Sequence, residues 1–564
     1  MPMKNAIKEI YTQRENFIII GLTGRSGSGC STSAELLERS FDQLSISEDN
    51  FLNKMDNSGR KIRIINKFAK KHWHPFFKIQ VRDVITTFIL ECTFDEIDSY
   101  FQQISIPNGI NEIKEEYEEY YNKNKCLDNV ILREYDKANA DEVYNYLKND
   151  LPIFTEKLKN HIDNKSSISF IKIYQKIGDN IRKNGIALPK EDINVEHIYA
   201  IAQRINVIIK ILRKYNKSKM IKDYFVIDTF RNPFEVFFFK ERYSAFYLIS
   251  INAPNEDRID RLSKKYDFPL STIEEIDEKE YSMADPLTDI SSFVSQNISS
   301  CIQHADIHVN NNGKFGNQNF NHLKNQLITF VSLIQHPGLI TPSRHEKLMQ
   351  IAFTAKLNSG CLSRQVGAVV TNEYRTIKAI GWNSSPDDQV PCTLRNLNDL
   401  ISNVDDTAYS YYEKTDIEFR NVAEKYFDKY PNIDELDGRS IYYCFKDLQN
   451  VKEGKKNQVH NRSLHAEENA FLQLAKYGSE GIKSGVLYTT ASPCDACSRK
   501  AYQLGISQIV YIDPYPGIAI DHVLKCGNQI PELILFSGAI GRAYHQLYTP
   551  ILPIKDELRA FMNI

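Results

Sequence analysis

The hydrophobic pattern divides the chain into stretches typical of alternating strands and helices and one long stretch typical of helices alone. Apolar runs that begin at Phe17 and occur at 224–228 and 245–254 predict buried strands. The runs 365–371 and 377–383 predict a hairpin of buried strands. In contrast, the region from Val81 to about Leu212 is rich in Lys, Glu, Asn, Tyr and Ile at helical spacing. The sequence therefore predicts an α/β fold interrupted by a mainly helical insertion.

The segment Asn310–Asn321 is the best candidate for a boundary between domains, because its Asn and Gly residues favour turns over regular structure. A chain of 564 residues is also expected to hold more than one domain. The predicted organisation is a first domain at 1–312 with its helical insertion at about 80–213, a linker and bridging helix at 313–340, and a second domain at 341–564 with an insert at about 387–461.

Composition excludes few classes of protein. A net charge of -2 argues weakly against nucleic acid as the main partner. The ten cysteines are scattered, and only two of them form a close pair. This distribution fits a reducing compartment, where thiols are available to bind metals rather than to form disulfides. The sequence shows neither a signal peptide nor an apolar stretch long enough to cross a bilayer, so we expect a cytoplasmic protein without a membrane partner.

Two motifs in the second domain predict a zinc site. Residues 464–471 read L-H-A-E-E-N-A-F, and residues 489–497 read T-T-A-S-P-C-D-A-C. His465, Cys494 and Cys497 supply one imidazole and two thiolates, which suit tetrahedral zinc with a fourth position open for water. Glu467 lies two residues after the histidine, where it can shuttle protons rather than bind the metal. H-x-E followed by P-C-x-x-C is the signature of zinc deaminases acting on nucleobases.

The alternatives for these motifs are a structural zinc site and a redox pair of cysteines. A redox pair would not need His465 and Glu467, and a structural zinc usually has four protein ligands. The sequence therefore favours a catalytic zinc.

Near the N-terminus, a predicted strand runs into the glycine-rich segment T-G-R-S-G-S-G-C-S-T, and a helix follows. This context suits a phosphate-binding loop. The candidate ligand groups are the backbone at Gly24, Gly27 and Gly29 and the hydroxyls of Ser31 and Thr32. The lysine of such loops is replaced by Cys30, which cannot supply charge to β- and γ-phosphates. A tight turn without a ligand is the alternative.

Further along, Asp228 ends a buried strand, where a carboxylate can hold Mg²⁺ through water. Arg258 and Arg261, on a predicted helix, could clamp phosphates. With the glycine-rich loop, these residues make the region from about 15 to 312, apart from its insertion, resemble P-loop nucleoside and nucleotide kinases. The resemblance implies bound nucleotide and Mg²⁺, and Cys30 favours a nucleotide-binding regulator over an active kinase.

The second domain resembles deoxycytidylate deaminases. The motifs C-L-S-R-Q-V-G-A-V-V (361–370), G-W-N-S-S-P (381–386), H-A-E-E-N-A and S-P-C-D-A-C follow one another in the order of that family. The resemblance implies a three-layer α/β/α fold around about five strands, with Glu467 as proton shuttle and Asn383 binding the sugar or the ring edge. It also implies a homo-oligomer, with a hexamer suspected.

As a whole, the chain resembles the bacterial anti-phage deoxycytidine nucleotide deaminases, which join kinase-like and deaminase halves. That resemblance implies conversion of dCTP, dCMP or both to deoxyuridine nucleotides, and depletion of the pool during infection. Two other functions stay open: a polynucleotide cytosine deaminase, and a nucleotide kinase or sensor with an appended deaminase. A regulatory nucleotide or RNA is a further candidate partner.

Two features are ambiguous in the sequence. The basic, aromatic segment Arg60–Lys78 suits either an RNA-binding face or, as we favour, a solvated helix face with aromatic residues beneath it. A second, structural zinc of the kind found in some deoxycytidylate deaminases would use Cys361, Cys392, Cys444 and His460. The alternative is ordinary buried cysteines and a surface histidine.

Overall fold

The computed structural model describes residues 2–46, 56–104, 106, 109–165, 170–191, 193–281, 291–316, 320–430, 433–478, 481–513 and 519–562. The chain forms two compact units: the first is Met1–Thr341 with Arg542–Ile564, and the second is Pro342–Gly541. The expected linker at 313–340 thus lies within the first unit, where the predicted bridging helix is α18 (Phe320–Gln335). Residues 317–319 of that linker lie outside the described residues.

The end of the chain differs from expectation, because residues 542–564 belong to the first unit rather than to the second. Ala560 of α27 (Ile554–Met562) packs with Ile7 and Tyr11 of α1 (Pro2–Asn16). In addition, Glu557 accepts a hydrogen bond from the Tyr11 hydroxyl and pairs with His336 at 3.0 Å. Neither helix carries a local sequence signal for this long-range packing.

The sheet of the first unit consists of parallel strands in the order β5-β4-β1-β3-β2. Parallel neighbours cannot be joined by a tight turn, so helices connect the strands by crossing over the sheet. Strands that are neighbours in the sheet therefore need not follow one another in the sequence. The strands read as continuous apolar runs, as expected for strands buried on both faces. Their bounds are β1 (Phe17–Thr23), β2 (Phe77–Gln80), β3 (Asp223–Asp228), β4 (Phe246–Asn252) and β5 (Ile307–Asn310).

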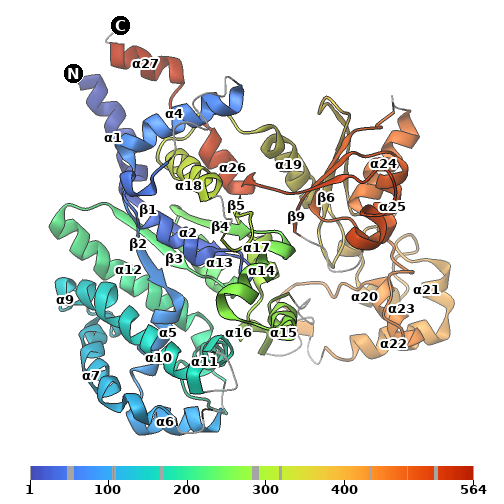
Figure 1. The fold of residues 1–564 in the computed structure, drawn as a ribbon. Helices are drawn as coiled ribbons and strands as arrows, with labels where there is room; N and C mark the ends of the chain where they lie inside the picture. The colour runs from blue at the N-terminus through green and yellow to red at the C-terminus, as the bar shows by residue number, and fades with distance from the viewer. Residues whose placement is uncertain are drawn as a thin grey trace. The chain divides into compact units, whose positions relative to one another are not determined.

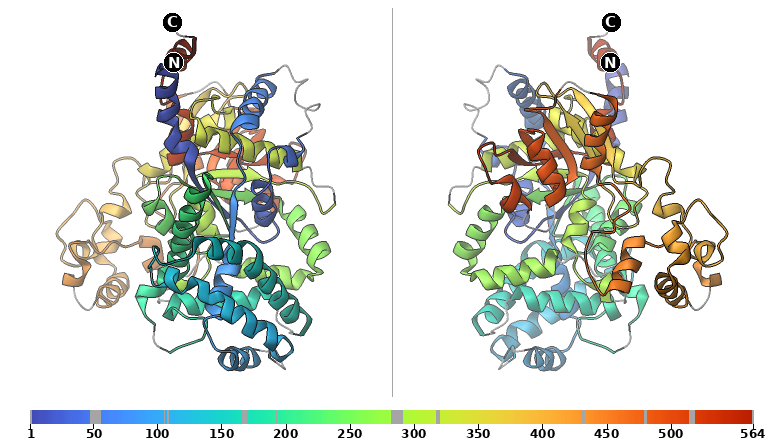
Figure 2. Two further views of the ribbon diagram at one scale, coloured as in Figure 1. Left: turned by 90° about the vertical axis from the view of Figure 1, so that its left-hand side faces the viewer. Right: turned by 90° about the vertical axis from the view of Figure 1, so that its right-hand side faces the viewer.

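The predicted helical insertion is present between β2 and β3, and its helices gather into one group (Figures 1 and 2). A single apolar core joins this group to β1, β3 and β4, so the insertion extends the unit's core. Its α-helices are α5 (Val81–Ile89), α6 (Phe94–Gln103), α7 (Lys114–Asn124), α8 (Asp128–Ile131), α9 (Ala140–Asn145), α10 (Leu151–Lys165), α11 (Phe170–Asn184) and α12 (Ala200–Lys219).

The other helices of the first unit connect the strands of its sheet. They include α2 (Cys30–Leu37), α4 (Asn57–His72), α13 (Pro233–Arg242), α14 (Asn255–Tyr266), α15 (Leu270–Tyr281), α16 (Ser291–Val294) and α17 (Ile298–Gln303). The basic segment that begins at Arg60 lies on α4 and the residues after it. Lys67, Lys70 and Lys71 are exposed while Phe76 is buried, as expected for a solvated helix face.

The second unit contains a five-stranded sheet in the order β10-β9-β8-β6-β7. The hairpin of β6 and β7 is antiparallel as predicted, β6 is also antiparallel to β8, and β8, β9 and β10 are parallel. The strands are β6 (Gly367–Thr371), β7 (Ile377–Trp382), β8 (Val486–Ala491), β9 (Gln508–Asp513) and β10 (Glu532–Leu535).

Alternation along β6 places apolar side chains on both faces of this sheet. Ala368 and Val370 pack in the core that includes α24 (Ala466–Tyr477) and α25 (Asp495–Gln503), whereas Val369 packs against α19 (Arg344–Ala355). Helices therefore cover both faces, and the predicted three-layer α/β/α fold of this unit is confirmed.

The insert between β7 and α24 forms its own small apolar core. It contains α20 (Leu397–Ile401), α21 (Tyr411–Thr415), α22 (Ile417–Phe427) and α23 (Phe445–Glu453), which stand to one side of the sheet of this unit (Figures 1 and 2). Within the described residues, no helix is long and apolar enough to cross a bilayer.

Candidate active site

The three predicted zinc ligands converge at the starts of two helices. His465 is the N-cap residue of α24 and Cys494 that of α25, while Cys497 lies in the first turn of α25. The Nδ1 atom of His465 is 3.3 Å from the sulfur of Cys494 and 3.5 Å from that of Cys497. Tetrahedral zinc with ordinary bond lengths would place nitrogen and sulfur ligands about 3.6 Å apart. The residues present therefore fit zinc without rearrangement.

Among the described residues, these three form the one group of His, Cys and acidic side chains close enough to share a metal ion. Cys361, Cys392, Cys444 and His460 form no such group, and His460 instead pairs with Glu453 at 3.0 Å. The structure thus favours the alternative for these residues: buried or partly buried free cysteines and a histidine in a surface ion pair.

The two thiols of the site titrate as a pair. A hydrogen bond from Cys497, reinforced by His465, lowers the pKa of Cys494 to about 3, whereas the same hydrogen bond and burial raise the pKa of Cys497. The hydrogen bond to Cys494 also raises the pKa of His465. Cys494 is thus the more readily deprotonated of the two thiols, and both would bind a metal as thiolates.

Glu467 lies in the first turn of α24 and is only 4% exposed. Burial raises the pKa of its carboxyl group, and its Oε1 atom accepts a hydrogen bond of 3.3 Å from the hydroxyl of Thr489 on β8. Because His465 precedes the helix and Glu467 is inside it, the carboxylate is held beside the metal ligands. This placement suits a proton shuttle.

Two neighbouring interactions fix the start of α24. The backbone N–H of His465 donates to the carboxylate of Glu468 at 3.4 Å, and that carboxylate also pairs with Lys500 of α25. Asn469 donates to the carbonyl oxygen of Trp382 at 2.9 Å. Thr489, Lys500 and Asn469 were not predicted from the sequence. Among these three, only the threonine was indicated by the sequence, through the T-T pair shortly before S-P-C. A strand residue at that position must face the helix that carries a metal ligand.

Asn383 follows directly after β7, beside the segment that leads into the zinc helix. The next residue, Ser384, accepts a hydrogen bond from the N–H of Leu464 at 2.9 Å. The side-chain amide of Asn383 donates to the carbonyl of Arg364 at 2.6 Å and accepts from the N–H of Val366 at 2.7 Å. In this state the amide orders the loop before β6, and its contact with a substrate stays a prediction.

The glycine-rich loop connects β1 to α2 as predicted. Gly27 has φ 82° and Gly29 has φ 105°, a left-handed backbone that favours glycine. A Cβ atom on Gly24 would approach the carbonyl oxygen of Ile251 to 2.5 Å. Ser31 and Thr32 lie in the first turn of α2. The loop therefore has the required backbone, while phosphate and Mg²⁺ binding stay predictions.

Two side chains near the loop limit its chemistry. Burial, followed by the nearby Asp228, raises the pKa of the Cys30 thiol to about 12, so the thiol is neutral. Asp228 is buried and accepts a hydrogen bond of 2.6 Å from the hydroxyl of Thr229. Neither residue supplies positive charge to a phosphate.

The arginines expected to clamp phosphates instead hold the loop itself. Arg258 donates to the carbonyl oxygen of Ser26 at 2.5 Å, and Arg261 donates to those of Gly27 at 3.2 Å and Ser28 at 3.3 Å. Their contact with a phosphate stays a prediction, because a sequence shows that an arginine lies near a loop but not which side of the loop it contacts.

Comparison with known proteins identifies the second unit. Residues 342–513 match the family model described as "Cytidine and deoxycytidylate deaminase zinc-binding region". The C-terminal region belongs to this deaminase family. The matched residues include the three candidate zinc ligands, Glu467 and Asn383.

Three individual proteins are similar to part of this chain. The chain is 26% identical over 182 residues to the deoxycytidylate deaminase of Saccharomyces cerevisiae, covering 32% of this chain and 41% of that enzyme. It is 28% identical over 170 residues to the deoxycytidylate deaminase of Enterobacteria phage T2, covering 30% and 79%. A solved apo dCMP deaminase from the cyanophage S-TIM5 is 21% identical with a TM-score of 0.21, covering 35% of this chain and 100% of that chain.

Proposed function

We propose that the protein hydrolyses the 4-amino group of deoxycytidine nucleotides, dCMP, dCTP or both, giving deoxyuridine nucleotides and ammonia. The observation that carries this proposal is the placement of Glu467, buried beside the triangle of His465, Cys494 and Cys497, inside a region of the deaminase family. Three protein ligands are typical of catalytic rather than structural zinc.

Each residue of the site has a separate role in the proposed reaction. Bound zinc would supply a Lewis acid that lowers the pKa of water. Glu467 would accept a proton from the attacking water, deliver it to the ring nitrogen N3 and then assist departure of the amine. Thr489 holds the carboxylate in place, and the pair of Glu468 and Lys500 holds the two helix starts together.

The choice of a free nucleotide rests on charge and on the relatives. A polynucleotide substrate requires a basic groove and aromatic stacking surfaces, whereas the net charge of this chain is -2. The yeast and phage relatives described above are named deoxycytidylate deaminases. A free nucleotide also needs no extraction from a stacked strand.

The test is direct. Purified protein loaded with zinc would be incubated separately with dCMP, dCTP, CMP and single-stranded DNA, and uracil-containing products would be measured by chromatography. We expect product from dCMP or dCTP. Product from DNA alone would replace this proposal with a polynucleotide deaminase.

We further propose that the reaction depletes the deoxycytidine nucleotide pool during phage infection. The support is the resemblance of the whole sequence to deaminases that join two such halves. Cells carrying the wild-type gene should resist phage and lose dCTP and dCMP on infection, while cells carrying Glu467→Gln should do neither. Protection by that variant would separate defence from deamination.

A further inference from the structure

A carboxylate of the protein itself binds Ser26 of the glycine-rich loop. Glu280, near the end of α15, is fully buried. Its two oxygens accept hydrogen bonds from the backbone N–H of Ser26 at 2.9 Å and from the Ser26 hydroxyl at 2.5 Å. The guanidinium of Arg231 pairs with the same carboxylate. The loop thus already binds an anion, contributed by an element 254 residues away in the chain.

The surroundings are built for negative charge. The loop ends in left-handed Gly29, which caps α2 without a side chain, so the first N–H groups of that helix receive no side-chain cap. Backbone N–H groups at such a turn and helix start favour anions. Burial of an isolated carboxylate is costly, and Arg231 offsets that cost here.

The shape of the loop does not depend on Glu280. Arg258 binds the carbonyl oxygen of Ser26, Arg261 binds those of Gly27 and Ser28, and Asn311 donates to that of Ser28 at 2.7 Å. These groups contact the carbonyl side of the loop, whereas Glu280 contacts an N–H group. The anion position would therefore persist if Glu280 left it.

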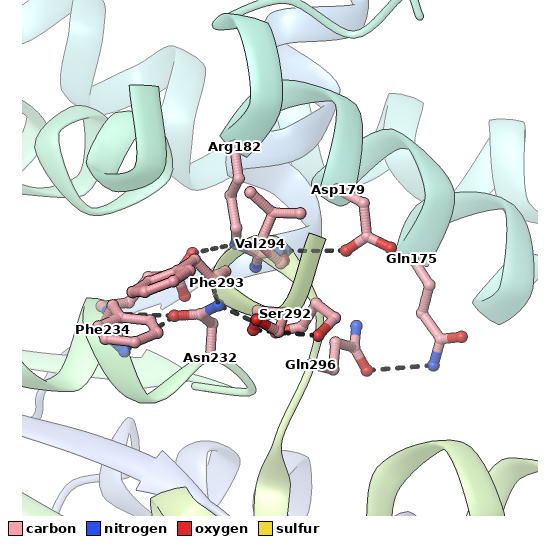
Figure 3. Close-up of polar contacts among 11 residues, drawn as sticks. Gln175, Asp179, Arg182, Asn232, Phe234, Ser292, Phe293, Val294 and Gln296 are labelled. Atoms are coloured by element: carbon pink, nitrogen blue, oxygen red, sulfur yellow. Dashed lines mark hydrogen bonds and ion pairs between the residues drawn. The ribbon is translucent and has the colours of Figure 1, made fainter. Parts of the chain in front are cut away.

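The same region tethers the chain on both sides of residues 282–290. Arg231 holds Glu280. Its neighbour Asn232 donates to the carbonyl oxygen of Phe293 at 2.8 Å (Figure 3) and to that of Ser295 at 2.9 Å. Arg182 also donates to the carbonyl oxygen of Val294 at 3.2 Å. The α16 segment is thus anchored independently of Glu280. Asp277 of α15 pairs with Arg25 at 2.8 Å and Arg258 at 2.6 Å, so displacement of Glu280 would release the residues after Asp277 and leave α16 in place.

We propose that the glycine-rich loop is a polyphosphate-binding site that Glu280 keeps closed, and that a polyphosphate binds by displacing Glu280 and releasing the end of α15. Arg231 then pairs with the phosphate in place of the carboxylate. No phosphoryl group is transferred, because the position of the usual lysine holds the neutral thiol of Cys30. The ligand class is a nucleoside triphosphate or a free polyphosphate chain, which share this chemistry.

Binding of inorganic triphosphate to the full-length protein tests the proposal without relying on deamination. Titration calorimetry would compare the wild type with Glu280→Ala and with a control, Glu278→Ala, an exposed residue of the same helix. We expect Glu280→Ala to bind at least about tenfold more tightly than the wild type, and the control to match the wild type. Equal affinity in all three proteins, or no binding by Glu280→Ala, would overturn the proposal.

Two further measurements guard against misfolding of the variant and identify the ligand. Saturating triphosphate should raise amide hydrogen exchange at residues 278–281 of the wild type, and unchanged exchange there contradicts displacement of Glu280. Where Glu280→Ala does not fold, Glu280→Gln keeps the volume and removes the charge, and it should also bind more tightly. Tighter binding of ATP than of triphosphate would assign the site to nucleotides, and equal binding would assign it to the phosphate chain.

Discussion

Replacement of Glu467 by glutamine separates proton transfer from metal binding. The side chain is 4% exposed, and its carboxylate accepts hydrogen bonds from the Thr489 hydroxyl and from its own backbone N–H. Glutamine keeps its length and volume, and its amide oxygen can still accept the bond from Thr489. His465, Cys494 and Cys497 are unchanged by the substitution. The variant therefore removes a proton-accepting group and leaves the coordination site intact.

The expected loss follows from the role of the carboxylate. A positioned general acid or base contributes about 10²–10⁴-fold to rate. At about 1.4 kcal/mol for each factor of ten, removal of Glu467 should raise the activation free energy by about 3–5 kcal/mol. Because the same carboxylate serves several proton transfers in the proposed reaction, we expect the larger end of this range. The zinc content per chain should not change.

Steady-state kinetics with dCMP and dCTP, together with metal analysis of the same preparation, check this expectation. Glu468→Gln is the matched control, because Glu468 is adjacent in sequence but binds Lys500 and the His465 backbone instead. The control should retain zinc and most of the activity. A Glu467→Gln protein that lost zinc, or that kept more than about a tenth of the wild-type rate, would refute the assignment of roles.

Three further outcomes are expected. Cys494→Ala should lose zinc by metal analysis and lose deamination, since two ligands hold the ion poorly; full activity of the metal-free protein contradicts this. Burial raises the pKa of Asp83 from 3.8 to about 6, so folding stability falls as pH rises through 6. Asp83→Asn should therefore raise the unfolding free energy by up to about 3 kcal/mol at pH 8 and by little at pH 4, measured by denaturant titration; an equal effect at both pH values contradicts the cause. Light scattering should show a homo-oligomer, and full activity as a 65.2 kDa monomer would contradict it.

The zinc site was predictable because its residues lie in two short sequence motifs. The H-x-E motif places a ligand at a helix start and an acid in the first turn, and P-C-x-x-C places two thiols around the start of the next helix. The run from Gly485 to Thr490 between them predicts a strand, and the observed strand β8 (Val486–Ala491) aligns the two helix starts on one side of the sheet. The continuous apolar run of β6 likewise indicates a strand that is packed on both faces.

The contents of the glycine-rich loop were not predictable in the same way. The spacing of Gly24, Gly27 and Gly29 predicts a turn with a free backbone, and the structure has that turn. Nothing local indicates that Glu280 reaches it, because polar pairing across 254 residues leaves no period or motif in the sequence. Orientation of Arg261 toward the loop carbonyls depends on the same tertiary arrangement.

The influence of the glycine-rich loop on the zinc site can be measured as the factor by which a ligand at the loop changes the affinity for substrate. A ligand at the loop changes substrate binding only if it binds two states of the protein with different affinity, and the change is then reciprocal. The closed and open positions of Glu280 supply two such states within the first unit. Reciprocity applies to binding rather than to turnover, so the appropriate protein is Glu467→Gln, which should bind dCMP without consuming it. If triphosphate shifts the affinity of this variant for dCMP by some factor, dCMP must shift its affinity for triphosphate by the same factor. A factor of one in both titrations would mean that the loop and the zinc site act independently.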